Sequence, residues 1–129
     1  MKMKGLLLAA CGAIAWLTGG CGAEQPEVVT PIAGPALHDL MQREDIFLVD
    51  VHIPEQRHIR GTDLFVPYNE IQKQRERFPQ DKSTSIYLYC RSGRMAMSAA
   101  QALQALGYRK VFNLEGGTEA WRAAGFEFD

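Results

Sequence analysis

The 129-residue sequence predicts one small α/β domain, in which a parallel sheet is flanked by helices. Three short apolar runs, at residues 46–49, 86–89 and 111–114, have the pattern of strands that are buried on both faces. Segments with a helical spacing of apolar residues lie between them. The length suits a single domain, and a composition of 47% hydrophobic and 22% charged residues is typical of globular proteins rather than disordered ones.

Two weaker segments extend the predicted sheet. Ile32 begins a predicted peripheral strand, and the short run 64–66, closed by Pro67, is a predicted fourth strand. Four helices are predicted. The first starts at Gly34-Pro35 and buries Leu37, Leu40 and Met41, and the second runs from Tyr68 to Phe78 with Ile71 facing inward. The third buries Met95, Ala99, Leu103 and Leu106 and ends at Gly107, and the fourth lies around Trp121 and ends at Gly125.

The first residues have the three zones of a secretory signal. Lys2 and Lys4 precede an uncharged stretch that runs from Gly5 to Ala23, and small residues come just before Cys21. A membrane-spanning helix is the alternative, but this stretch contains five glycines, which are poor helix formers. We therefore predict that residues 1–20 are a signal peptide.

The segment Leu17-Thr18-Gly19-Gly20-Cys21 resembles a bacterial lipobox, in which the cysteine is lipidated and becomes the first residue of the mature chain. This resemblance implies lipidation of Cys21. Prolines at 26, 31 and 35 indicate a tether, which we place at residues 21–31, before a folded domain over residues 32–129. The predicted location is the periplasmic side of a membrane, and Gly22 favours the outer membrane. Ordinary cleavage, which would leave a soluble periplasmic protein, and an uncleaved anchor are the alternatives.

Charge and cysteine content exclude several classes of protein. The 14 Lys and Arg residues against 15 Asp and Glu residues do not predict nucleic-acid binding. Three cysteines are too few for a disulfide-stapled protein, and removal of Cys11 with lipidation of Cys21 leaves Cys90 as the free thiol. The three histidines have no recognisable zinc-binding spacing, so we predict no metal site.

The chemistry is predicted in the loop Cys90-Arg91-Ser92-Gly93-Arg94-Met95, which joins the most apolar strand to the best helix. Ligands of open α/β sheets bind at the carboxyl ends of strands. Backbone amides converging at the start of a helix would favour the thiolate of Cys90, and Arg91 and Arg94 could receive a small dianion. The alternative is a cysteine that is only a small core residue, but its polar and cationic flanks favour a functional one.

At these residues the chain resembles the rhodanese family of sulfurtransferases, over roughly residues 32–128. The resemblance is carried by the order of Leu48-Val49-Asp50-Val51, Pro54-Glu55, His58-Ile59-Arg60-Gly61, the Cys90 loop, Ala99-Ala100 with Leu103, Gly107-Tyr108, and Leu114-Glu115-Gly116-Gly117 followed by Trp121 and Gly125. It implies a three-layer rhodanese-like domain in which Cys90 carries a persulfide. The implied partners are a thiosulfate-like donor and a cyanide or thiol acceptor, which includes a sulfur-acceptor protein, and no cofactor is implied.

The resemblance also implies roles for the neighbours of Cys90. Arg91, Ser92, Gly93, Arg94 and Met95 would bind the substrate, while Asp50 and His58 would support the loop. His52 stands where many members have arginine, and Met95-Ala96 stands where Arg-Ser is common. Arg94 resembles the arrangement in small periplasmic phage-shock rhodaneses.

Two rival functions are weighed beside this one. Cysteine phosphatases of the same architecture need an arginine six residues after the nucleophile, and Ala96 occupies that position. A non-catalytic persulfide carrier or partner-docking module is the rival from another class.

Overall fold

The computed structural model describes residues 28–129. The predicted signal peptide, the lipidation site Cys21 and most of the predicted tether lie outside these residues. No helix within 28–129 is long and apolar enough to cross a membrane.

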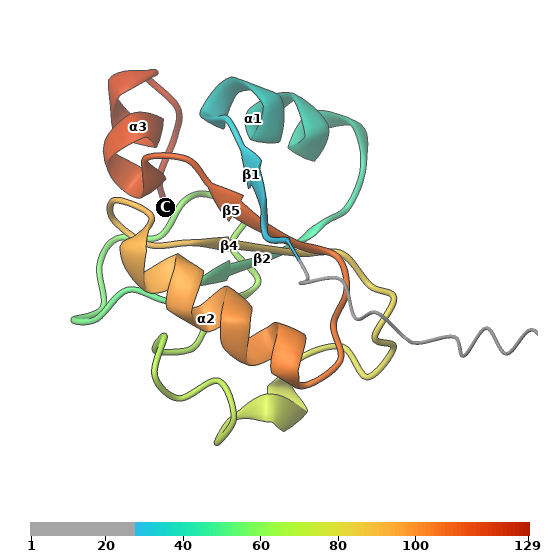
Figure 1. Ribbon diagram of the computed structural model, residues 1–129. Coiled ribbons are helices and arrows are strands. Elements are labelled where there is room, and N and C mark those ends of the chain that lie inside the picture. Colours follow the sequence, from blue (N-terminus) through green and yellow to red (C-terminus); the bar gives the residue numbers. More distant parts are fainter. Residues whose placement is uncertain (1–27) are drawn as a thin grey trace, which may run out of the picture.

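The core of the structure is a five-stranded parallel sheet with the order β1-β5-β4-β2-β3 (Figure 1). The strands are β1 (Thr30–Ile32), β2 (Phe47–Asp50), β3 (Leu64–Phe65), β4 (Ile86–Tyr89) and β5 (Val111–Leu114). The parallel sheet is therefore confirmed. A peripheral strand is also present, but it ends at Ile32, where the sequence predicted its start. That strand begins at Thr30, two residues inside the segment predicted as tether.

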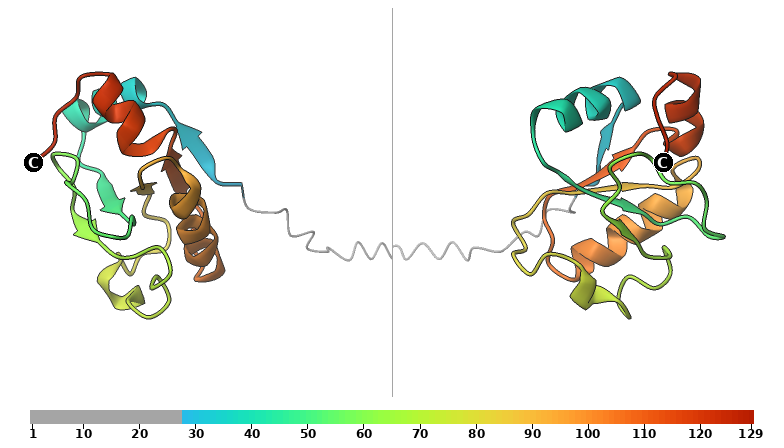
Figure 2. Two further views of the ribbon diagram at one scale, coloured as in Figure 1. Left: turned by 90° about the vertical axis from the view of Figure 1, so that its left-hand side faces the viewer. Right: turned by 180° about the vertical axis from the view of Figure 1, so that it is seen from behind.

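Helices cover both faces of the sheet and make three layers (Figures 1 and 2). Helices α1 (Gly34–Arg43) and α3 (Gly117–Ala123) lie on one face, and α2 (Arg94–Ala105) lies on the other. The three-layer α/β fold predicted from the sequence is confirmed.

Alternate residues of the central strands face different layers, as the pleat of a strand requires. Leu48 and Tyr89 belong to the core under α1 and α3. Val49, Leu88 and Cys90 belong to the core under α2. This burial on both faces explains the continuous apolar runs in the sequence.

The helix predicted from Tyr68 to Phe78 is wrong. The segment consists of turns and one short 3-10 helix, η1 (Arg75–Arg77). Ile71 is buried as predicted, and Phe78 is buried beside it, but the other residues of this segment are partly or fully exposed. Two buried side chains seven residues apart do not form a continuous apolar stripe, and such a stripe is what stabilises a surface helix.

Because every strand is parallel, all carboxyl ends lie at one edge of the sheet. This edge brings together Asp50 at the end of β2, Cys90 after β4 and Glu115 after β5. The functional residues predicted from the sequence are concentrated here.

Candidate active site

Cys90 is 1% exposed and lies at the base of the loop that links β4 to α2. Its Sγ accepts hydrogen bonds from the backbone N–H of Gly93 at 3.0 Å and of Ala96 at 3.4 Å. Gly93 has a φ of 112°, which residues with a side chain rarely adopt, so the tight loop depends on glycine at this position. Two backbone amides thus point at the sulfur, and such donors favour a negative charge on it.

Hydrogen bonds to its carbonyl groups hold the loop in this conformation. The carbonyl oxygen of Cys90 accepts from the N–H of Thr118 at 2.9 Å, and that of Arg91 accepts from the N–H of Glu119 at 3.2 Å. The side-chain amide of Asn113 donates to the carbonyl oxygen of Gly93 at 3.1 Å. With these carbonyl groups bound to α3 and β5, the loop can direct amide N–H groups toward Sγ.

Gly117 allows α3 to approach the loop this closely. A Cβ atom at this position would lie 2.3 Å from the carbonyl oxygen of Cys90 and 2.5 Å from the carbonyl carbon of Arg91. No other residue fits without displacing the loop backbone. The Gly116-Gly117 pair noted in the sequence therefore has a packing role next to the active loop.

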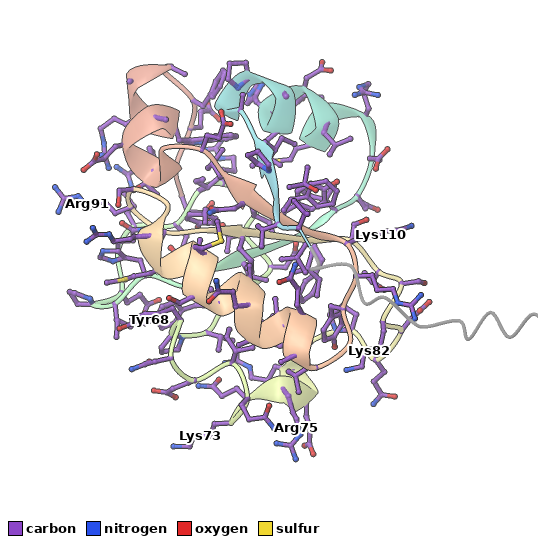
Figure 3. All side chains as sticks on the ribbon, in the orientation of Figure 1. Tyr68, Lys73, Arg75, Lys82, Arg91 and Lys110 are labelled. Carbon is purple, nitrogen blue, oxygen red and sulfur yellow. The ribbon has the colours of Figure 1, made fainter. Side chains whose placement is uncertain are left out.

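The two arginines of the loop lie in different surroundings. The Nε of Arg91 donates to Glu119 Oε1 at 3.0 Å, and the side chain projects from the edge of the molecule (Figure 3). Arg94 and Met95 line a shallow hollow of about 220 Å³ with Tyr68 and Ser98. Ser92 is exposed.

Asp50 and His58, for which a supporting role is predicted from the sequence, lie together. Asp50 is fully buried; its Oδ1 accepts from the N–H of His52 at 3.0 Å, and its Oδ2 lies 2.8 Å from Nδ1 of His58. The Nε2 of His58 lies 2.7 Å from Oε2 of Glu55. Burial lowers the pKa of His58, but its hydrogen bonds to Glu55 and Asp50 and their negative charges outweigh burial and raise the pKa above 6.5.

The Asp50–His58 pair is connected to the active loop through Gln56. Its Nε2 lies 3.4 Å from Asp50 Oδ1, and its Oε1 accepts from Thr118 Oγ1 at 3.3 Å. Thr118 in turn binds the Cys90 carbonyl oxygen. A chain of hydrogen bonds therefore runs from Asp50 through Gln56 and Thr118 to the backbone of the active loop.

A polar cleft of about 320 Å³ lies against the outer side of the active loop. It is lined by His52, Pro54–Gln56, Arg91, Thr118 and Arg122. Within residues 28–129, no three His, Cys, Asp or Glu side chains are placed to hold a metal ion.

Several residues of this site were not found from the sequence. Ala96 supplies a sulfur-bound amide from one position beyond the predicted cradle, and Gln56, Thr118 and Arg122 gave no local signal. Asn113 did give one, because it is a polar residue inside the apolar run of a strand buried on both faces.

Comparison with known proteins assigns the fold to a family. The model of the rhodanese-like domain matches residues 28–124. A solved rhodanese-like domain protein of Staphylococcus aureus superposes with a TM-score of 0.65 at 26% identity, over 78% of this chain and 99% of that one.

Two relatives at the sequence level have names that refer to sulfur transfer. A sulfurtransferase of Allochromatium vinosum is 33% identical over 67% of this chain and 80% of its own length. The thiosulfate sulfurtransferase GlpE of Coxiella burnetii is 32% identical over 66% of this chain and 79% of its own length.

Two further relatives are matched over a smaller share of their own lengths. The Synechocystis protein slr1261 is 32% identical over 80% of this chain, and this match spans 58% of that protein. The putative sulfur carrier protein YrkF of Bacillus subtilis is 31% identical over 52% of this chain and 35% of its own length. The family model matches most of this chain, and the cysteine loop lies at the carboxyl edge of a three-layer parallel fold. The chain therefore belongs to the rhodanese-like domain family.

Proposed function

We propose that the chain is a sulfurtransferase that takes the sulfane sulfur of thiosulfate onto Cys90 and passes it to cyanide or a thiol. The observation that carries this proposal is the position of Cys90. Its side chain is buried, and its Sγ accepts hydrogen bonds from the backbone N–H groups of Gly93 and Ala96. The names of the Allochromatium and Coxiella relatives support it.

The chemistry follows from this surrounding. The Cys90 thiolate attacks the outer sulfur of thiosulfate; a sulfur–sulfur bond forms to Sγ, the original one breaks, and sulfite leaves with the electron pair. Amides that stabilise a thiolate also stabilise the terminal negative charge of the persulfide. Cyanide or a thiolate then attacks the outer sulfur, and the electron pair returns to Sγ.

Arg91 and Arg94 are proposed to attract the anionic donor. Arg91 already pairs with Glu119, whereas Arg94 lies in the open hollow beside the loop. Ser92, Gly93 and Met95 complete the loop around the sulfur, and Asp50 with His58 supports it.

The test is thiocyanate formation from thiosulfate and cyanide, together with the mass of the protein after thiosulfate alone. We expect wild-type protein to gain the mass of one sulfur atom and to turn over repeatedly, and Cys90→Ser to do neither. Because a serine hydroxyl can accept the same two amide hydrogen bonds, we expect Cys90→Ser to stay folded by circular dichroism. Retained turnover in this variant would contradict the mechanism.

A sulfur-carrier role is the second candidate, and the similarity to the putative sulfur carrier YrkF favours it. The same assay separates the two. A carrier gains one sulfur atom and releases it once to a partner, whereas an enzyme produces many thiocyanate molecules for each Cys90.

We also propose that Cys21 is lipidated and that the domain is held at the periplasmic side of a membrane, with the outer membrane favoured. The support is the signal-like segment at residues 1–20 and the lipobox-like residues before Cys21.

A further inference from the structure

The polar cleft beside the active loop contains one arginine that no carboxylate neutralises. We propose that this cleft is the site of the sulfur acceptor and that Arg122 binds the carboxylate of a small thiol there. The inference rests on the proposed sulfur transfer and identifies the chemical class of the second substrate.

The other charged groups that line the cleft have partners of opposite sign. Arg91 donates to Glu119 at 3.0 Å, and Glu55 lies 2.7 Å from the His58 ring, which it shares with Asp50. Within residues 28–129, no carboxylate lies within 4.0 Å of the guanidinium nitrogens of Arg122. A ligand that enters the cleft therefore meets one guanidinium group that has no carboxylate partner among the described residues.

Arg122 is held in place in a way that leaves its donors available. Its guanidinium carbon lies 4.9 Å from the centre of the Phe128 ring. Phe128 is itself fixed, because it forms an antiparallel bridge with Ile59. No hydrogen bond within residues 28–129 uses the guanidinium N–H groups of Arg122, so they are available to bind a carboxylate.

The cleft also adjoins the backbone of the active loop. Arg91, in its wall, directly follows Cys90, and Thr118, also in its wall, binds the Cys90 carbonyl oxygen at 2.9 Å. Its volume of about 320 Å³ is ample for a small thiol. The shallower hollow of about 220 Å³ on the α2 side, which contains Arg94, is the competing location.

The proposed step is balanced without a further reactant. The acceptor thiolate attacks the outer sulfur of the Cys90 persulfide and forms a new sulfur–sulfur bond. The bond from that sulfur to Cys90 Sγ breaks, and its electron pair returns to Sγ. The products are the free Cys90 thiolate and a persulfide on the acceptor.

The experiment uses three thiols of similar size that differ in charge: mercaptopropionate, mercaptoethanol and cysteamine, which are anionic, neutral and cationic. Full-length protein is loaded with thiosulfate, or with polysulfide if thiosulfate does not load it. Loss of the persulfide is then followed by mass spectrometry. For each variant, the rate of persulfide loss to mercaptopropionate or cysteamine is divided by its rate of loss to mercaptoethanol. Each ratio is then compared with the same ratio in wild type. The intrinsic reactivity of each thiol is the same in both proteins and cancels from this comparison.

We expect Arg122→Glu to lower the mercaptopropionate ratio about tenfold and to raise the cysteamine ratio, because a charge-assisted hydrogen bond is replaced by repulsion. Arg122→Lys keeps the charge and should retain most of the preference. Arg109→Glu is the matched control: this exposed arginine adjoins Lys110, which lies at the edge of the molecule opposite Arg91 (Figure 3). It should leave all ratios unchanged.

Three results would overturn the inference. The first is that the mercaptopropionate and cysteamine ratios are equal in wild type and Arg122→Glu, and the second is that Arg109→Glu changes these ratios as much as Arg122→Glu does. The third is that Arg94→Glu loses the preference for the anionic thiol while Arg122→Glu keeps it. The failure of the broader proposal looks different, because Cys90 would then gain no sulfur from either donor, and the acceptor site would fall with it.

Discussion

His58 has a carboxylate on each side of its ring, which determines its protonation. Asp50 Oδ2 lies 2.8 Å from Nδ1 and Glu55 Oε2 lies 2.7 Å from Nε2, so both ring nitrogens face acceptors. Both can donate only in the imidazolium form. The ion pairs therefore stabilise the folded state while the ring is charged.

This arrangement predicts how stability depends on pH. The folded-state pKa of His58 is raised above the ordinary value of 6.5, so its contribution is complete below 6.5 and is lost as pH rises through the folded-state pKa. We expect the free energy of unfolding in urea to decrease across a window that begins near 6.5 and extends upward.

His58→Gln provides the comparison that isolates this effect. The difference in unfolding free energy between wild type and His58→Gln should be largest at about pH 5.5 and should shrink by about pH 8.5. Glu55→Gln, which removes one of the two carboxylates, should give a smaller pH-dependent difference. A difference that stays constant over this range would contradict the charged pair.

At the scale of elements, the contact between α3 and the active loop depends on one glycine. Gly117 has a φ of 53°, and a Cβ there would lie 2.3 Å from the Cys90 carbonyl oxygen. Helix α3 also supplies the Thr118 and Glu119 N–H groups that bind the loop carbonyl oxygens. Stability and sulfur transfer should therefore both be sensitive to this position.

We expect Gly117→Ala to destabilise the domain by about 2–4 kcal/mol, from backbone strain together with a clash against the loop backbone. Gly125→Ala is the control: this residue also has a positive φ, of 81°, but a Cβ there meets nothing within 4 Å. It should show the strain alone. Urea unfolding measures the difference, and equal losses in the two variants would show that the approach of α3 is not tight.

The elements also show what the sequence could and could not predict. Buried strands were found because their apolar runs reflect burial on both faces, and α2 was found from the spacing of Ala99 and Leu103. The segment 68–78 was mistaken for a helix because its two buried side chains are fixed by tertiary contacts rather than by local periodicity.

Only the local part of the site could be predicted from the sequence. The Cys90 loop could be predicted because its cysteine, arginine and glycine residues are close together in the chain. The contributions of Gln56, Thr118 and Arg122 were not, because they depend on long-range contacts such as the hydrogen bond between Thr118 and Gln56, 62 residues apart.

At the scale of the whole molecule, the parallel sheet separates the amino end of the domain from the active loop. Thr30 begins β1 at the amino edge of the sheet, whereas Cys90 follows β4 at the carboxyl edge (Figure 1). A lipid on Cys21 would therefore hold the domain by the edge opposite the active loop. Anchoring should leave the loop accessible to small donors and acceptors.

This separation leads to a prediction about the full chain in a Gram-negative host fed labelled palmitate. We expect label on the wild-type protein and on Cys11→Ser, because Cys11 lies within the proposed signal peptide, and no label on Cys21→Ser. The wild-type protein should fractionate with membranes and Cys21→Ser should not, since two acyl chains are enough for stable anchoring.

Thiosulfate should load Cys90 at the same rate in the wild-type protein and in Cys21→Ser, because the proposed attachment lies at the opposite edge of the sheet. Label that persists in Cys21→Ser would contradict the lipidation site, and faster loading of the released protein would show that the membrane obstructs the loop.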